Sequence, residues 1–143
     1  MTQEEFKDFL KAISVCFVQR DFAMWEGLIR LPFAMVTGDG PVLLSNRDEL
    51  KTNFGHYLVA MDIMQLDTVH REAIALEDCR DGTFIGTYRT ELLSRGKRAT
   101  DPYTSSALLH PSSKGWQMSS IMNARGHHEW TGHSPNGKRD QND

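Results

Sequence analysis

The sequence predicts an α+β fold in which N-terminal helices pack on a mostly antiparallel sheet. Two observations lead to this prediction. Before Leu66, apolar residues recur at intervals of three and four, which is the period of an amphipathic helix. From Leu66 to Ala124, segments rich in β-branched and aromatic residues alternate with short polar turns, as in strands joined by hairpins. At 143 residues the chain is long enough for one such domain.

The first element is a helix that begins after Thr2 and ends near Arg20. Thr2 and Glu5 have the spacing of a capping box, in which each side chain binds the other residue's backbone N–H. The residues that follow at helical spacing are apolar: Phe6, Phe9, Leu10, Ile13 and Phe17. The width of this apolar face predicts burial on more than one side.

A shorter helix and a small hairpin come next. Asp21 is a suitable N-cap, and Pro32 marks the end of the helix because a residue before proline is pushed out of the α region. Residues 33–37 and 42–44 then read as strands around the turn at residues 38–41, whose sequence is Gly-Asp-Gly-Pro.

The third helix begins after Ser45 or Asn46, with Asp48 and Glu49 favourably placed in its first turn. Gly55 weakens this helix by about 1 kcal/mol relative to alanine, so we expect a packing reason for it. Its buried stripe is predicted to contain Leu50, Phe54, Tyr57, Leu58 and Met61.

Four strands are predicted after the third helix. Their turns lie at residues 77–82, 94–98 and 111–115, each of which contains glycine. The last three strands run over Phe84 to Leu93, Tyr103 to His110 and Trp116 to Ala124. Because short loops join them, neighbouring strands should pair antiparallel.

Composition excludes several classes of protein. A formal net charge of -3 does not provide the dense basic face that nucleic acid requires, and no apolar run approaches the length of a membrane span. The acidic start at Glu4 and Glu5 is unlike a signal peptide, so a cytoplasmic location is expected. We therefore expect neither nucleic acid nor a membrane as a partner.

The C-terminus differs in composition from the rest. We expect a single domain over residues 1–126 and a polar tail, partly disordered, over residues 127–143. His127, His128, Glu129 and His133 could bind a metal adventitiously, but a physiological site needs ligands on a rigid scaffold. No phosphate loop or nucleophile motif is present. No metal and no cofactor are therefore predicted.

The order of helix, helix, hairpin, helix and long antiparallel strands resembles the nuclear transport factor 2-like (NTF2-like) superfamily. Three local features contribute to the resemblance: Leu31-Pro32-Phe33 after the second helix, Asn46-Arg47-Asp48-Glu49 at the start of the third, and Gly-Trp-Gln-Met at residues 115–118. This superfamily includes ketosteroid isomerases and SnoaL-like polyketide cyclases. The resemblance implies a cone, in which a strongly curved sheet wraps around the helices and encloses an apolar pocket, and a homodimer formed through the sheet.

The isomerase chemistry of that superfamily is not recognisable here. Those isomerases use an aspartate base near the first hairpin, with a tyrosine and a protonated acid as the oxyanion hole, the latter being a standard example of a carboxylic acid kept neutral. Asp39 is the nearest acid, but between two glycines it reads as an exposed turn residue. The catalytic residues are therefore unknown.

Strand alternation indicates which residues face a pocket. On the strand after residue 83, Phe84, Gly86, Tyr88, Thr90 and Leu92 share the more aromatic face, which we expect to point inward. For the strand from Tyr103 to His110 the inward face is left open. His110 is expected at the rim, His56 at the mouth and His70 at the surface. The predicted pocket-lining residues are Trp25, Phe33, Met35, Tyr57, Met61, Tyr88, His110, Trp116 and Met118.

These expectations favour a SnoaL-like pocket protein that binds a small apolar ligand, cyclic or polyketide-like. Where such a protein is an enzyme, the resemblance implies isomerisation, cyclisation or dehydration without a cofactor. The alternative is a non-catalytic binding or assembly module on the same fold, so enzymatic activity is left open. The homodimer is expected to use Ile85, Arg89, Glu91, Ile121 and Asn123 on the outer face of the sheet.

Overall fold

A computed structural model describes residues 1–124 of the chain, and residues 125–143 lie outside that description. Three helices precede most of the sheet. The elements in order are α1 (Gln3–Val18), α2 (Phe22–Gly27), β1 (Ile29–Thr37), β2 (Gly40–Leu44), α3 (Arg47–Met64), β3 (Thr68–Asp78), β4 (Phe84–Ser94), β5 (Lys97–Arg98), β6 (Tyr103–Ser112) and β7 (Gly115–Met122).

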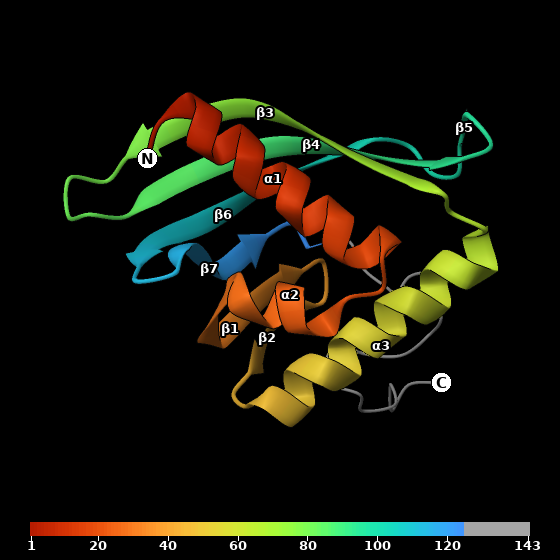
Figure 1. Cartoon of the computed structure of the whole chain (residues 1–143), viewed down its shortest axis with the longest axis horizontal. Helices are drawn as coiled ribbons and strands as arrows, with labels where there is room; N and C mark the ends of the chain where they lie inside the picture. Colours follow the sequence, from red (N-terminus) through yellow and green to blue (C-terminus); the bar gives the residue numbers. More distant parts are fainter. Residues whose placement is uncertain (125–143) are drawn as a thin grey trace.

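The strands form one curved, open, mixed sheet with the order β2-β1-β7-β6-β4-β3, and the short β5 pairs with β4. All pairs are antiparallel except β1 with β7, which is parallel. The three helices lie on one side of the long strands, and α1 runs along them (Figure 1). The predicted α+β class, with helices on a curved and mostly antiparallel sheet, is confirmed.

Local capping explains where the helices begin. In α1 the Thr2 hydroxyl accepts from the Glu5 N–H at 3.1 Å, and the Glu5 carboxylate accepts from the Thr2 N–H at 2.8 Å. The Asp21 side chain accepts from Met24 N at 3.0 Å at the start of α2. Asn46 does the same for Glu49 N in α3 at 2.9 Å. Each cap satisfies an N–H that has no partner within its helix.

Two local expectations were wrong. The second helix does not continue to Pro32: it ends at Gly27, and Pro32 lies inside β1. The chain leaves the helix early because Ile29 pairs with Met118 of β7, and the Leu28 carbonyl accepts from Met118 N at 2.9 Å. A β-carbon added at Gly55 would meet nothing within 4 Å, so no packing contact explains that glycine.

A β-bulge in each of two strands changes which residues face inward. In β3, Ala73 pairs with Tyr88 and Ala75 with Thr87, which leaves Ile74 as the extra residue. In β7, Met118 pairs with Leu109 and Ser120 with Leu108, which leaves Ser119. One extra residue exchanges the two faces of a strand beyond it.

The β7 bulge corrects one predicted position. Met118 and Ile121 are three residues apart, yet both point towards the helices, and Ile121 packs against the core. Ile121 therefore does not belong to the outer face on which we expected it. We call the side of the sheet that faces the helices the inner face and the opposite side the outer face.

Candidate functional site

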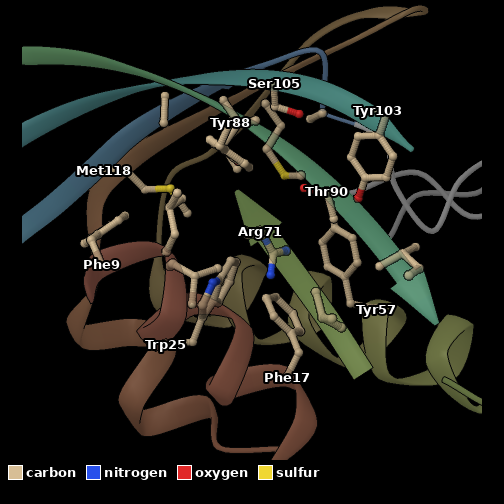
Figure 2. Close-up of a pocket in the computed structure, with 18 of the residues that line it drawn as sticks. Phe9, Phe17, Trp25, Tyr57, Arg71, Tyr88, Thr90, Tyr103, Ser105 and Met118 are labelled. Carbon is tan, nitrogen blue, oxygen red and sulfur yellow. The ribbon is translucent and has the colours of Figure 1, made fainter. Parts of the chain in front are cut away.

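A cavity lies between the inner face of the sheet and the three helices (Figure 2). The cavity has a volume of about 60 Å³, counted as the region that the centre of a water-sized sphere can occupy. This volume is several times what one water molecule needs on the same measure. Most of the lining is aromatic or aliphatic. The described residues that line it are Phe6, Phe9, Leu10, Ile13, Phe17, Trp25, Met35, Tyr57, Met61, Leu66, Val69, Arg71, Tyr88, Thr90, Leu92, Tyr103, Ser105, Ala107, Met118, Ile121 and Ala124.

Polar side chains gather on one part of this lining. Sheet register places Arg71 of β3 opposite Thr90 of β4, and Thr90 opposite Tyr103 of β6. We call these three residues the polar row. Tyr88 and Ser105 are register partners in the adjacent row, on the same inner face. The sheet therefore holds five polar side chains against an otherwise apolar space.

Arg71 carries the only positive charge among the described lining residues. One of its terminal nitrogens, Nη1, donates to Ser14 Oγ at 2.8 Å, and Ser14 Oγ in turn donates to the Leu10 carbonyl at 3.1 Å. The guanidinium lies over the Phe17 ring, 5.9 Å from its centroid. The side chain points into the space that Trp25, Phe17 and Tyr57 surround (Figure 2).

Three buried polar atoms on the lining make no hydrogen bond to any described group. They are Arg71 Nε, Trp25 Nε1 and Thr90 Oγ1. Trp25 is 2% exposed and Thr90 is 1% exposed. A buried donor without an acceptor costs about 1–3 kcal/mol. Three atoms around one cavity therefore retain an unused capacity for hydrogen bonding.

All three tyrosines of the chain line the cavity. Burial raises the pKa of Tyr57 well above its ordinary value. Burial also raises the pKa of Tyr88, against the opposing effect of the Arg71 charge. Both hydroxyls therefore keep their protons at neutral pH. The described lining contains no carboxylate, imidazole or thiol, so its polar groups are suited to donating hydrogen bonds rather than to removing a proton.

Six of the nine residues predicted to line a pocket lie on this cavity: Trp25, Met35, Tyr57, Met61, Tyr88 and Met118. The other three do not. Phe33 is fully buried in the core beside Trp25. Trp116 lies near the start of α1, where its Nε1 donates to Glu5 at 3.1 Å. His110 lies on the outer face, with Nε2 2.6 Å from Ser119 Oγ.

The other candidate bases also lie away from the cavity. Burial lowers the pKa of His110, and the Arg30 charge lowers it further. His70 is exposed on β3, and His56 does not line the cavity. Asp39 is an exposed residue of the β1–β2 turn, where its N–H donates to Thr37 Oγ1 at 3.1 Å. None of these four groups lines the cavity.

Sequence reasoning missed Arg71, Thr90, Tyr103 and Ser105 as a group. A usable signal was present in β3, where Arg71 alternates with Val69 and Ala73, while the opposite face carries His70 and Glu72. The more apolar face of β3 is expected to be the buried one. Arg71 is therefore a charged residue on the face that is expected to be buried. Pairing β3 with β4 then places Thr90, on the predicted inward face of β4, beside it.

The residues predicted for a dimer lie in different environments. Ile85 and Arg89 are exposed on the outer face. Glu91 accepts a hydrogen bond from Arg98 Nη2 at 3.0 Å within the same chain. Asn123 follows β7 and donates to the Thr104 carbonyl. Of these four residues, Glu91 and Asn123 therefore already make polar contacts within their own chain.

The described residues contain neither a metal-binding cluster nor a helix suited to a membrane. Residues 1–124 contain no group of three or more histidine, cysteine, aspartate or glutamate side chains placed to hold a metal. No helix in the same range has the length and hydropathy of a membrane span. The cluster of His127, His128, Glu129 and His133, and the tail as a whole, lie outside the described residues.

Comparison with known proteins relates the chain to others by fold. No protein-family model matches it, and no curated protein matches its sequence. Among solved structures, a domain of unknown function with a cystatin-like fold from Nostoc punctiforme has a TM-score of 0.62 at 13% identity, over 87% of this chain and 79% of that one. An NTF-2 like protein of unknown function from Shewanella oneidensis has a TM-score of 0.60 at 10% identity, over 85% of this chain and 98% of that one.

An NTF2-like superfamily protein from Salmonella enterica has a TM-score of 0.55 at 9% identity, over 85% of this chain and 91% of that one. Identities this low relate the fold alone. The predicted NTF2-like fold is confirmed: the chain has the α+β architecture of these structures.

Proposed function

We propose that this protein binds a small, mostly apolar cyclic molecule in the cavity between the helices and the inner face. The supporting observation is a cavity whose aromatic lining meets a cluster of hydrogen-bond donors on one side only. Apolar lining contributes affinity, and a few placed polar groups set the orientation of a ligand. Flat rings suit the lining, because Phe17, Trp25 and Tyr88 present aromatic surfaces to the same space.

Binding and orientation are favoured over catalysis by the chemistry of the lining. Isomerisation, cyclisation or dehydration needs a group that accepts a proton. The described lining offers hydroxyl, indole and guanidinium groups instead. We therefore propose the non-catalytic alternative, a ligand-binding module, as the function of this site, in a cytoplasmic protein.

Titration calorimetry with a panel of neutral one- and two-ring compounds, including benzamide and 2-naphthamide, tests this proposal. We expect at least one compound to bind with 1:1 stoichiometry. The Ala107→Leu variant should weaken that binding about tenfold or more, because Ala107 is buried on the lining and the added carbons occupy ligand space. Ala75→Leu, on the exposed part of β3, is the matched control. No binding by the whole panel would contradict the proposal, as would equal binding by the two variants.

We also propose that the outer face forms a homodimer. Three large apolar side chains are exposed there: Ile74 of β3 at 55%, Ile85 of β4 at 37% and Met122 of β7 at 59%. Arg89 is exposed on the same outer face of β4 as Ile85 and provides a polar contact that can set the register of two copies. Sedimentation at micromolar concentration should show the dimer mass, and Ile85→Asp should shift it to the monomer mass. A wild-type protein of monomer mass would contradict this.

A further inference from the structure

Arg71 places a permanent positive charge beside an apolar cavity. A guanidinium stays protonated at every physiological pH, and removing such a charge from water costs several kcal/mol unless it is paired. Within residues 1–124 the ion pairs join Lys7 with Glu4, Arg20 with Asp62, Arg47 with Glu26, and Arg98 with Glu91. None includes Arg71. The described chain therefore leaves the charge of Arg71 without a negative partner.

The donors around Arg71 indicate what kind of group completes the site. Arg71 Nε and Trp25 Nε1 each carry an N–H that meets no described acceptor, and Thr90 Oγ1 carries an O–H in the same state. Arg71 and Trp25 both contact the Phe17 ring. Arg71 and Thr90 are register partners on adjacent strands. The three groups therefore surround one part of the cavity, and what that part requires is an acceptor of several hydrogen bonds.

A carboxylate fits this requirement better than other anions. Its two oxygens accept about four hydrogen bonds, and its planar shape matches the fork of a guanidinium. A doubly charged phosphate would need a second cation, but the described lining contains no other arginine and no lysine. The remaining lining is aromatic and aliphatic, so the body of the ligand is apolar.

We infer that the ligand of this cavity is an apolar cyclic carboxylic acid, bound as its carboxylate by Arg71 with Trp25 and Thr90 as further donors. This inference rests on the ligand-binding function proposed above, and it adds the charge and the orientation of the ligand. The carboxylate lies at Arg71, and the ring system points towards Met118 and Phe9, which line the cavity away from the polar row.

Titration calorimetry at pH 7 with 2-naphthoate and 2-naphthamide tests the inference, because the two probes have the same ring and nearly the same shape and differ in charge. We expect the full-length protein to bind 2-naphthoate at least about tenfold more tightly. Arg71→Met should remove this preference, so that the affinities for the two probes lie within about twofold of each other. Arg89→Met removes the same charge from the outer face of neighbouring β4 and should leave both affinities unchanged.

The outcomes separate this inference from the proposed function. Equal affinity for the two probes in the wild type would overturn the carboxylate site and leave the pocket proposal standing. Binding of neither probe, nor of any compound in the neutral panel, would overturn both. An equal loss of affinity for both probes in a folded Arg71→Met protein would also overturn the inference, since Arg71 would then support only the shape of the cavity.

A second variant keeps the test valid if Arg71→Met does not fold. Arg71→Lys retains the charge but loses the planar fork. It should weaken the binding of 2-naphthoate by about threefold or more relative to the binding of 2-naphthamide. Unchanged affinity for 2-naphthoate would contradict a bidentate contact from Arg71.

Discussion

Two arginines lie over phenylalanine rings, one at the surface and one at the cavity, but only one of them has an acid beside it. At the surface, Arg47 lies 5.2 Å from the centroid of Phe22 and contacts Glu26 at 2.8 Å. At the cavity, Arg71 lies 5.9 Å from the centroid of Phe17 and donates a hydrogen bond to the neutral Ser14 hydroxyl. The surface pair is complete within the chain, whereas the inner arginine is not.

This difference shows which of the two arginines is unfavourable for folding. Exposed ion pairs add little, typically 0–1 kcal/mol, so their residues can be exchanged without consequence. A half-buried charge with no acid is unfavourable for folding and persists only where something else compensates for it. We therefore expect substitutions on the inner face to have larger effects on stability than substitutions on the outer face, and of either sign.

The largest effect is expected at Gly86, on the inner face of β4. A β-carbon there would lie 2.5 Å from Cε1 of Phe6 and 3.1 Å from Leu109. Gly86→Val should therefore lower the free energy of unfolding by about 3 kcal/mol, as overpacked cores do. Gly55→Ala is the matched control, since nothing lies within 4 Å of its added carbon, and it should raise stability by about 0.5–1 kcal/mol. Denaturant unfolding measures both, and similar values would contradict the close packing of α1 on β4.

The next effect has the opposite sign. Arg71→Met should raise the free energy of unfolding by about 1–3 kcal/mol, because an unpaired charge is replaced by an apolar side chain of similar length. Arg98→Met removes an exposed pair with Glu91 and should change stability by less than about 1 kcal/mol. Urea unfolding without added ligand is the measurement. A strongly destabilised Arg71→Met protein would show that Arg71 is paired within the full chain.

Alkaline pH should also distinguish buried from exposed groups. Burial raises the pKa of the Cys16 thiol from 9.0 to about 11. As pH rises, the thiol therefore loses its proton in the unfolded chain before it does so in the folded protein. The contribution of Cys16 to the free energy of unfolding is complete below pH 9 and is lost as pH rises to about 11. We expect a loss of about 2 kcal/mol across this window. Denaturant unfolding at a series of pH values measures this loss. Cys16→Ala should flatten the dependence of the free energy of unfolding on pH, while Cys79→Ala in the β3–β4 turn should not. Superimposable profiles for all three proteins would contradict the burial of Cys16.

The smallest effect is expected at Asp39. This residue is exposed in the β1–β2 turn and does not line the cavity. Asp39→Asn should therefore leave stability within about 0.5 kcal/mol and affinity for 2-naphthamide within about twofold. A large loss of affinity in a folded protein would restore an isomerase-like role for this acid.

Some features of this protein follow from the sequence alone. Thr2, Asp21 and Asn46 determine where the helices begin, because each satisfies a backbone N–H within its own first turn. Hairpin turns determine that the long strands pair antiparallel. The inward face of β4, with Tyr88 and Thr90, follows from alternation because no bulge interrupts that strand.

Other features were decided only by tertiary structure. Pairing of Ile29 with Met118 ended the second helix early, and the extra residues Ile74 and Ser119 changed which side chains face inward. Ile121 was misplaced for this reason, since alternation holds only while the register is unbroken, and a bulge depends on the neighbouring strand rather than on local residues. Arg71 meets Ser14 and Phe17 of α1 for the same kind of reason. Contacts between elements 57 residues apart in sequence arise from packing, which the local pattern of a strand does not contain.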